Sequence, residues 1–256
     1  MVWDNQIEDC TSMFAGLDNI IEVDLSNFDS SKVTSMSEMF CDCTNITSIT
    51  FNNIDTSLVN SMDSIFMNCE SLISLDLSGI NTKSLNIMNY MFCNCKSLIS
   101  LNLNNFNTSL VYTMQELFGK CSSIKALDLS SFNTSQLGIM TLMFAECNEL
   151  TSIDISHFDL SKAIAINYMF YNCNKLTYIN MANLNMSKVP YINYLFYNCS
   201  NLEFIDFTNF TESLSIDKDN IFEGVPDNFS YCIILFHKSF IIFKNFFFEH
   251  FFNYNT

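Results

Sequence analysis

The stretch that decides the fold is Met91–Met114, MFCNCKSLISLNLNNFNTSLVYTM. Versions of it recur along the chain, and the phenylalanine near its start returns every 26 residues without insertion or deletion. These phenylalanines are Phe14, Phe40, Phe66, Phe92, Phe118, Phe144, Phe170, Phe196 and Phe222. A fixed period of roughly 20 to 50 residues is typical of a solenoid, in which each unit covers the apolar side of the next. The sequence therefore predicts a stack of about eight 26-residue units.

Two periodicities alternate inside each unit when its phenylalanine is counted as position 0. Positions 9 and 11 are apolar, as in Leu101 and Leu103, while positions 8, 10 and 12 are mostly polar. This alternation predicts a short strand with one buried face. A second stripe has the spacing i, i+3, i+4 and i+7: Met36, Met39, Phe40 and Cys43. That spacing predicts a short helical segment. In the next unit, the Asp-Thr-Ser of residues 55–57 lies just upstream of the corresponding segment and would supply its N-cap side chains.

The fold class predicted from these units is an α/β solenoid. Stacking places a parallel sheet on one face and the short helical segments on the other. Adjacent, register-aligned strands are expected to carry Leu75, Leu101, Leu127 and Ile153.

The predicted solenoid spans residues 1–224 and starts in mid-repeat, because Ile7, Cys10 and Met13 occupy late positions of a unit whose strand is missing. Residues 225–256 lose the 26-residue phase and are predicted to form a non-repeat hydrophobic tail. Solenoids need polar caps at their ends, and none is visible at the start. A partial gene product is therefore one open interpretation.

The unit reads MFxNCxSLxSLDLSxFxTSxVxxM and closely resembles the 26-residue repeat of bacterial surface proteins, the BspA-like leucine-rich-repeat family. The resemblance covers roughly residues 7–224. It implies a noncatalytic leucine-rich solenoid of a cell-surface or secreted protein, with a role in adhesion or binding. One departure is position 14, where Phe or another apolar residue replaces the asparagine found in other leucine-rich repeats.

Charge and composition narrow the function classes. The chain has 11 Lys plus Arg against 27 Asp plus Glu, a formal net charge of −16. This balance argues against nucleic acid and anionic lipid as partners. The first 20 residues contain no secretory signal, and charged residues interrupt the Phe-rich stretch 231–256, so no stable membrane span is predicted. No nucleophile, metal or cofactor motif is visible, so we expect no enzyme, no cofactor and no metal site.

A column of seven cysteines stands at position 3: Cys43, Cys69, Cys95, Cys121, Cys147, Cys173 and Cys199. Zinc would need converging ligands, and none of the three histidines lies in a Cys cluster. Stacked cysteines have parallel Cβ vectors, which disfavours disulfides. We predict buried free thiols that act as small apolar side chains.

Two surfaces are candidate ligand sites. The first is an acidic column on the strand face, Asp24, Asp76, Asp128, Asp154 and Asp206. It could bind Ca²⁺ or a basic ligand, or it could be a solvated row of carboxylates with raised pKa values. The second is an aromatic patch on the helical side, Tyr168, Tyr171, Tyr194 and Tyr197, which could bind a partner or reflect compositional drift.

The predicted function is a noncatalytic repeat binding module of a cell-surface or secreted protein, acting in adhesion or in protein or glycan interaction. Docking is expected on the strand face, with a basic, hydroxyl-rich or cation-bridged partner. The alternative is an intracellular protein–protein interaction scaffold, because columns of free thiols suit a reducing compartment such as the cytoplasm.

Overall fold

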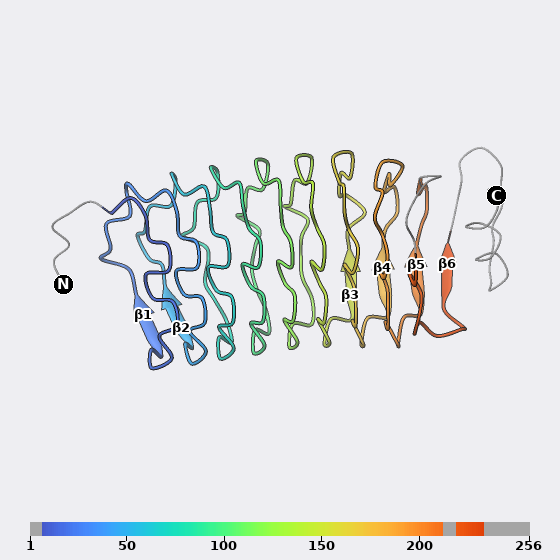
Figure 1. Cartoon of the computed structure of the whole chain (residues 1–256), viewed down its shortest axis with the longest axis horizontal. Helices are drawn as coiled ribbons and strands as arrows, with labels where there is room; N and C mark the ends of the chain where they lie inside the picture. The colour runs from blue at the N-terminus through green and yellow to red at the C-terminus, as the bar shows by residue number, and fades with distance from the viewer. Residues whose placement is uncertain (1–6, 212–218, 233–256) are drawn as a thin grey trace.

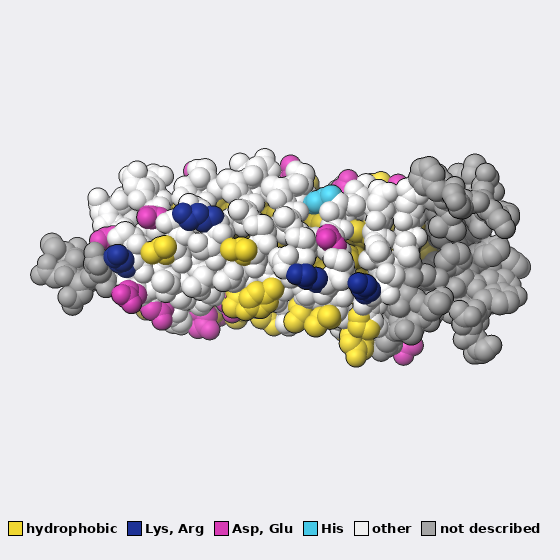
Figure 2. All heavy atoms as spheres, turned by 90° about the horizontal axis from the view of Figure 1, so that it is seen from above, with side chains coloured by type: hydrophobic (Ala, Val, Ile, Leu, Met, Phe, Trp, Pro, Cys, Tyr) yellow, Lys and Arg dark blue, Asp and Glu magenta, His cyan; other side chains and the backbone are white. Residues whose placement is uncertain are grey.

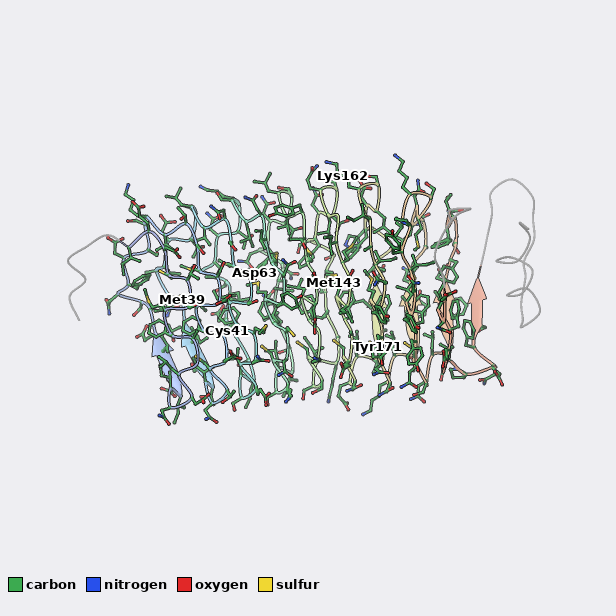
Figure 3. The ribbon with its side chains drawn as sticks, viewed as in Figure 1. Met39, Cys41, Asp63, Met143, Lys162 and Tyr171 are labelled. Carbon is green, nitrogen blue, oxygen red and sulfur yellow. The ribbon has the colours of Figure 1, made fainter. Side chains whose placement is uncertain are left out.

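The computed structural model describes residues 7–211 and 219–232. Figure 1 shows one elongated solenoid, in which successive turns follow one another along the long axis. In Figure 3, Met39 and Met143 lie inside the coil, whereas Lys162 lies at its outer edge. Both methionines are fully buried within a single hydrophobic cluster that runs through the stack. The predicted solenoid is confirmed.

Within the described residues, six strands of three residues each lie along one side of the coil. Their bounds are β1 Glu22–Asp24, β2 Ser48–Thr50, β3 Ser152–Asp154, β4 Tyr178–Asn180, β5 Phe204–Asp206 and β6 Ser230–Cys232. Every pair is parallel, and partners are offset by one repeat, as in Val23 opposite Ile49. The parallel pairing predicted from the 26-residue period is therefore confirmed.

The prediction of one continuous sheet is wrong. The strands form a two-stranded sheet, β1-β2, and a four-stranded sheet, β3-β4-β5-β6. The segments around Leu75, Leu101 and Leu127 are not strands in the described structure. Backbone bonds between turns remain there, such as the one from the Ile99 N–H to the Ile73 carbonyl (3.1 Å). Other contacts between these turns hold the stack, so complete strand pairing is not required.

The predicted helical segments are also wrong, because no helix forms within residues 7–211 and 219–232. A helix would satisfy its N–H groups internally. Here some N–H groups donate to the next turn and others donate within their own turn. Those of Glu38 and Phe40 donate to carbonyls of the next turn, at 2.7 and 2.9 Å, whereas that of Cys41 donates back to Glu38 at 2.9 Å. Consecutive tight turns thus bury the stripe that the sequence assigned to a helix.

Left-handed residues at two positions of every unit explain why a helix cannot form. The first column, at position 24, is Ser12, Glu38, Ser64, Tyr90, Glu116, Leu142, Tyr168, Tyr194 and Asn220. The second, at position 2, is Gly16, Asp42, Asn68, Asn94, Lys120, Glu146, Asn172, Asn198 and Gly224. A left-handed residue every few positions interrupts any right-handed helix. The glycines and asparagines of the second column tolerate this conformation best.

The position-0 phenylalanines form a stacked column through the core. Phe92, Phe118 and Phe144 are fully buried, with ring centroids 5.6 and 5.8 Å apart and planes within 6° of parallel. At another position of the unit, isolated parallel bridges connect successive turns from Asp9 to Tyr191. Aromatic stacking and these bridges persist where the sheet is interrupted.

A buried threonine ladder links the middle turns. The Thr108 hydroxyl donates to the Asn133 carbonyl (2.9 Å) and accepts the Asn133 N–H (2.8 Å). The ladder members are Thr56, Thr82, Thr108 and Thr134. In later turns Leu160 and Met186 fill the same column. The ladder links successive middle turns through hydrogen bonds from side chain to backbone.

The 26-residue register continues past the predicted solenoid boundary at 224. Strand β6 pairs with β5, with Phe204 opposite Ser230, and Figure 1 shows β6 as the last labelled turn. The rest of the predicted tail, residues 233–256, lies outside the described residues. For that segment the separate tail stays a prediction.

Candidate functional site

The cysteine column is buried, as predicted, and its thiols are free. Each thiol also donates a hydrogen bond to a phenylalanine carbonyl of the preceding turn, as Cys121 does to Phe92 at 3.0 Å. Burial raises the pKa of Cys199 to about 12, and the pKa of Cys147 also lies well above its usual range because of burial. Protonated, buried thiols are poor nucleophiles and metal ligands. The column therefore has a structural role.

No group of His, Cys, Asp and Glu side chains that could hold a metal ion occurs among the described residues. Likewise, the described part of the chain has no helix long and apolar enough to cross a membrane.

The acidic column lies on the strand side, and its carboxylates hold the turns that follow the strands. Asp76 accepts the Ser78 N–H at 2.9 Å, and Asp128 accepts the Ser130 N–H at 3.0 Å. Corresponding bonds join Asp24 to Ser26, Asp154 to Ser156 and Asp206 to Thr208. This side-chain-to-backbone turn is a frequent role for Asp, so the fold accounts for the column.

The raised carboxylate pKa values expected for this column are wrong for Asp24, Asp76, Asp128 and Asp154, whose pKa values are lowered. Hydrogen bonds from Ser78 lower the pKa of Asp76, and those from Ser130 lower the pKa of Asp128. Burial raises the pKa of Asp154, but bonds from Ser156 and from the Asn180 amide (2.9 Å) outweigh this effect and lower it. Hydrogen bonds to the ionised form favour that form more than neighbouring carboxylates oppose it.

The four predicted tyrosines come together as an ordered array. We call Tyr168, Tyr171, Tyr194 and Tyr197 the tyrosine array. Tyr168 stacks on Tyr194, with centroids 4.8 Å apart and planes at 4°, and Tyr171 stacks on Tyr197 at 5.1 Å and 10°. Within a turn, Tyr168 meets Tyr171 at 5.7 Å in an edge-to-face arrangement. Each ring therefore contacts two others, and all four remain partly exposed.

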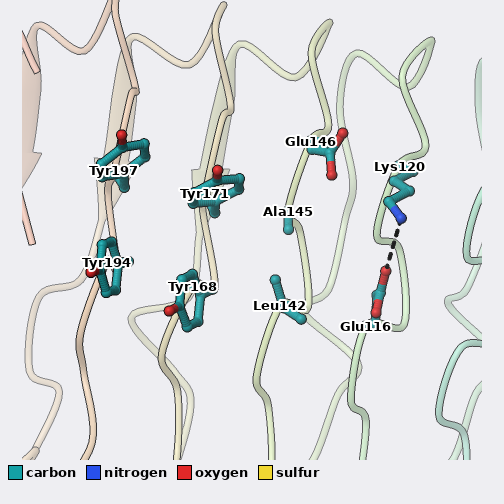
Figure 4. Close-up of a pocket in the computed structure, with 9 residues that line it drawn as sticks. All are labelled: Glu116, Lys120, Leu142, Ala145, Glu146, Tyr168, Tyr171, Tyr194 and Tyr197. Carbon is teal, nitrogen blue, oxygen red and sulfur yellow. Dashed lines mark ion pairs between the residues drawn. The ribbon is translucent and has the colours of Figure 1, made fainter. Parts of the chain in front are cut away.

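An open groove of about 530 Å³ lies beside the tyrosine array. Figure 4 shows the rings followed along the solenoid by the smaller Leu142 and Ala145, then by Glu116 and Lys120. Glu146 also lines the groove. The Lys120 ammonium lies 3.9 Å from the Glu116 carboxylate. Sequence reasoning found the tyrosines but missed these charged residues, because their positions in the unit carry no constant residue type.

Exposed hydrophobic side chains over the N-terminal half of the face drawn in Figure 2 do not suggest a second site, because they are separate. In Figure 2 they are separate spots over the N-terminal half of that face and gather along one edge further on. Leu58 and Leu110, for example, are exposed and occupy the same position in their units, but Ser84 occupies that position in the unit between them. Isolated surface hydrophobics are normal in soluble proteins and need no ligand to explain them.

Two solved structures are similar to parts of this chain. A leucine-rich repeat protein from Bacteroides ovatus is 18% identical, with a TM-score of 0.41, and the match covers 87% of this chain and 65% of that one. A leucine rich cell surface protein from Faecalibacterium prausnitzii is 16% identical, with a TM-score of 0.30, over 78% of this chain and 62% of that one. The chain thus spans a little under two thirds of both proteins. No curated protein matches it.

Both of these solved structures are leucine-rich-repeat proteins, the class of repeat that this chain's sequence resembles. One family model matches twice, over residues 8–127 and 98–210, and so covers most of the repeat region. The chain therefore belongs to the family described as Mycoplasma protein of unknown function, DUF285.

Proposed function

We propose that the protein is a noncatalytic binding module that recognises a protein partner through the tyrosine array. The observation that carries this proposal is that the fold does not need tyrosine at these positions. Equivalent positions hold Ser64, Glu116, Gly119 and Ala145 in other turns, which keep the same left-handed backbone and inter-turn bonds. Partly exposed aromatic side chains that the fold does not require are typical of interfaces.

The stacked geometry suits recognition. Rings that already pack on one another lose little side-chain freedom on binding, so an ordered array offers contact area at low entropic cost. The backbone bonds between turns, such as the Phe170 N–H to the Leu195 carbonyl at 3.0 Å, hold the array on a rigid support. A rigid, repeated aromatic surface supports binding, because it offers contact area on a fixed support.

We place this activity at the cell surface or outside the cell, with adhesion as its role, because the repeats resemble those of BspA-like surface proteins. An intracellular scaffold is the alternative location. Protease treatment of intact cells that make the protein separates the two. Loss of the protein without lysis supports the surface, and protection until lysis supports the intracellular scaffold.

The acidic column is the second candidate surface, because exposed carboxylates recur along the length of the solenoid. It would attract a basic or cation-bridged partner, or a hydroxyl-rich glycan, through many weak contacts. Individual exposed charge pairs contribute about 0–1 kcal/mol, so binding by this column should weaken strongly with salt.

The two surfaces are distinguished by two variants of the whole chain. The first replaces array residues with those of other turns, Tyr168→Ser, Tyr171→Ala, Tyr194→Ser and Tyr197→Ala. The second is Asp76→Asn, Asp128→Asn and Asp154→Asn. In affinity capture from host-surface proteins, the first variant should lose the partners of the unsubstituted chain and the second should keep them. The reverse result would move the site to the acidic column.

A further inference from the structure

We propose that the groove beside the tyrosine array holds an arginine or lysine side chain of a basic protein segment. The inference rests on the proposed function and specifies the chemistry of the partner. Three features of the groove support it: the orientation of the rings, the residues opposite them, and the charges around them.

The ring orientation presents aromatic faces to the groove. Tyr168 and Tyr194 occupy the same position in successive turns, and their rings are almost parallel at 4.8 Å. The ring planes therefore lie across the solenoid, with their faces directed along it. One face of Tyr168 is covered by Tyr194, and the opposite face points towards the turn of Leu142, as Figure 4 shows. Tyr171 presents a face towards Ala145 in the same way.

The turn opposite those faces has small side chains where the tyrosines would otherwise continue. Ala145 occupies the position of Tyr171, and Leu142 occupies that of Tyr168. The stack therefore stops abruptly, which leaves the open groove next to the ring faces. A flat or elongated group can enter there and lie against a tyrosine face. Guanidinium and ammonium groups bind such faces through the negative electrostatic potential of the ring.

Carboxylates stand at both ends of the array. Glu146 lines the groove, and no Lys or Arg of the described residues pairs with it, whereas Glu116 is already paired with Lys120. At the other end, the exposed Glu223 carboxylate is close enough to Tyr197 to raise the pKa of its hydroxyl group. A cation in the groove would contact a ring face and neutralise Glu146. The net charge of −16 would also attract a basic partner.

The test is a titration of the full chain with three probes, in which isothermal titration calorimetry measures the binding of each probe. The probes are a hexapeptide of alternating Gly and Arg, its citrulline counterpart, and chitohexaose. Citrulline keeps the size and planarity of arginine but has no charge. We expect the Arg peptide to bind and the other two probes to bind at least about tenfold more weakly.

Three variants locate the contact. Tyr168→Ser with Tyr171→Ala, and separately Glu146→Gln, should each weaken binding of the Arg peptide by roughly fivefold or more. The matched control is Tyr178→Ser on the strand face, where Ser152 stands in the preceding turn. It should leave binding unchanged. Far-UV circular dichroism and urea midpoints show that each variant is folded.

The outcomes separate this inference from the proposed function. Equal binding of the citrulline peptide, or array-dependent binding of chitohexaose alone, overturns the basic partner but leaves the array as a binding surface. Binding of the Arg peptide that is lost only in the Asp76→Asn, Asp128→Asn and Asp154→Asn variant also overturns it, because the cation then binds the acidic column. Unchanged partner capture by the array variant overturns the proposed function itself.

Discussion

The middle turns and the C-terminal turns are linked in different ways. In the middle, buried hydroxyls such as that of Thr108 bond the N–H and the carbonyl of one residue in the next turn. The segments expected to be strands there do not pair into a sheet. Towards the C-terminus, Leu160 and Met186 take the threonine position, and the four strands β3 to β6 form a parallel sheet. The phenylalanine and cysteine columns run through both regions.

This difference shows that a solenoid can provide hydrogen-bond partners for its backbone N–H and C=O groups in more than one way. Buried N–H and C=O groups must find partners, and here either a side-chain ladder or a strand ladder supplies them. The two devices also coexist, because Ser30 accepts the Asp55 N–H (2.8 Å) in the turns that carry β1 and β2. The shared columns must therefore contribute most of the stability, and the linking devices should contribute less.

The largest effect should come from alkaline pH, which acts on a column common to both regions. Burial raises the pKa of Cys199 to about 12 from its ordinary 9.0. The folded state keeps the proton that the unfolded chain loses, so the stabilisation is complete below pH 9 and is lost as pH rises towards 12. Each such thiol should lower the free energy of unfolding by about 1.4 kcal/mol per pH unit in that window.

Urea denaturation at pH 9, 10 and 11 measures this loss. Because the column is continuous, both regions should lose stability together. Cys199→Ser removes one titrating group and should reduce the pH slope by about 1.4 kcal/mol per unit. A slope that is the same in this variant would show that Cys199 does not titrate with unfolding.

The next largest effect should come from the phenylalanine column. Phe118→Ala in the middle and Phe170→Ala in the C-terminal region each remove a fully buried ring stacked on both sides. Each should lower the free energy of unfolding by about 3–5 kcal/mol, measured by urea denaturation. A much smaller loss at Phe170 would mean that the sheet, and not the shared column, dominates the C-terminal region.

A smaller effect is expected from the threonine ladder, which belongs to the middle region. Thr108→Val leaves both backbone groups of Asn133 without their hydroxyl partner. The free energy of unfolding should fall by about 1–3 kcal/mol, and hydrogen exchange of the Asn133 amide should accelerate. The control is Thr47→Val, whose exposed hydroxyl bonds the Ile21 carbonyl (3.2 Å) and can be replaced by water. Equal losses in the two variants would argue against the ladder.

The smallest effect, and a stabilising one, is expected at the boundary between the regions. Leu142 has a left-handed backbone, with φ of 61°, which a residue with a side chain adopts at a cost. Leu142→Gly should raise the free energy of unfolding by up to about 1 kcal/mol, seen as a higher urea midpoint. A lower midpoint would show that the packing of the Leu142 side chain outweighs the backbone strain.

The sequence by itself determined the stacking. Identical side chains returning every 26 residues can be buried together only if successive turns lie in register, which predicts the parallel pairing and the buried Phe40 and Cys43 columns. It also identified the aspartates and tyrosines as columns. It could not identify Glu146 and Glu223 as neighbours of the tyrosine array, because no repeated residue type marks them.

Only the tertiary structure decided the local conformation. An apolar spacing of three and four residues fits a helix and a chain of tight turns equally well, so Met36, Met39 and Phe40 could not distinguish the two. The distinction lies in where the N–H groups donate, and here those of Glu38 and Phe40 donate to the next turn. Likewise, whether a strand segment pairs depends on the neighbouring turn, which is why Val23 is in a sheet and Leu101, with the same pattern, is not.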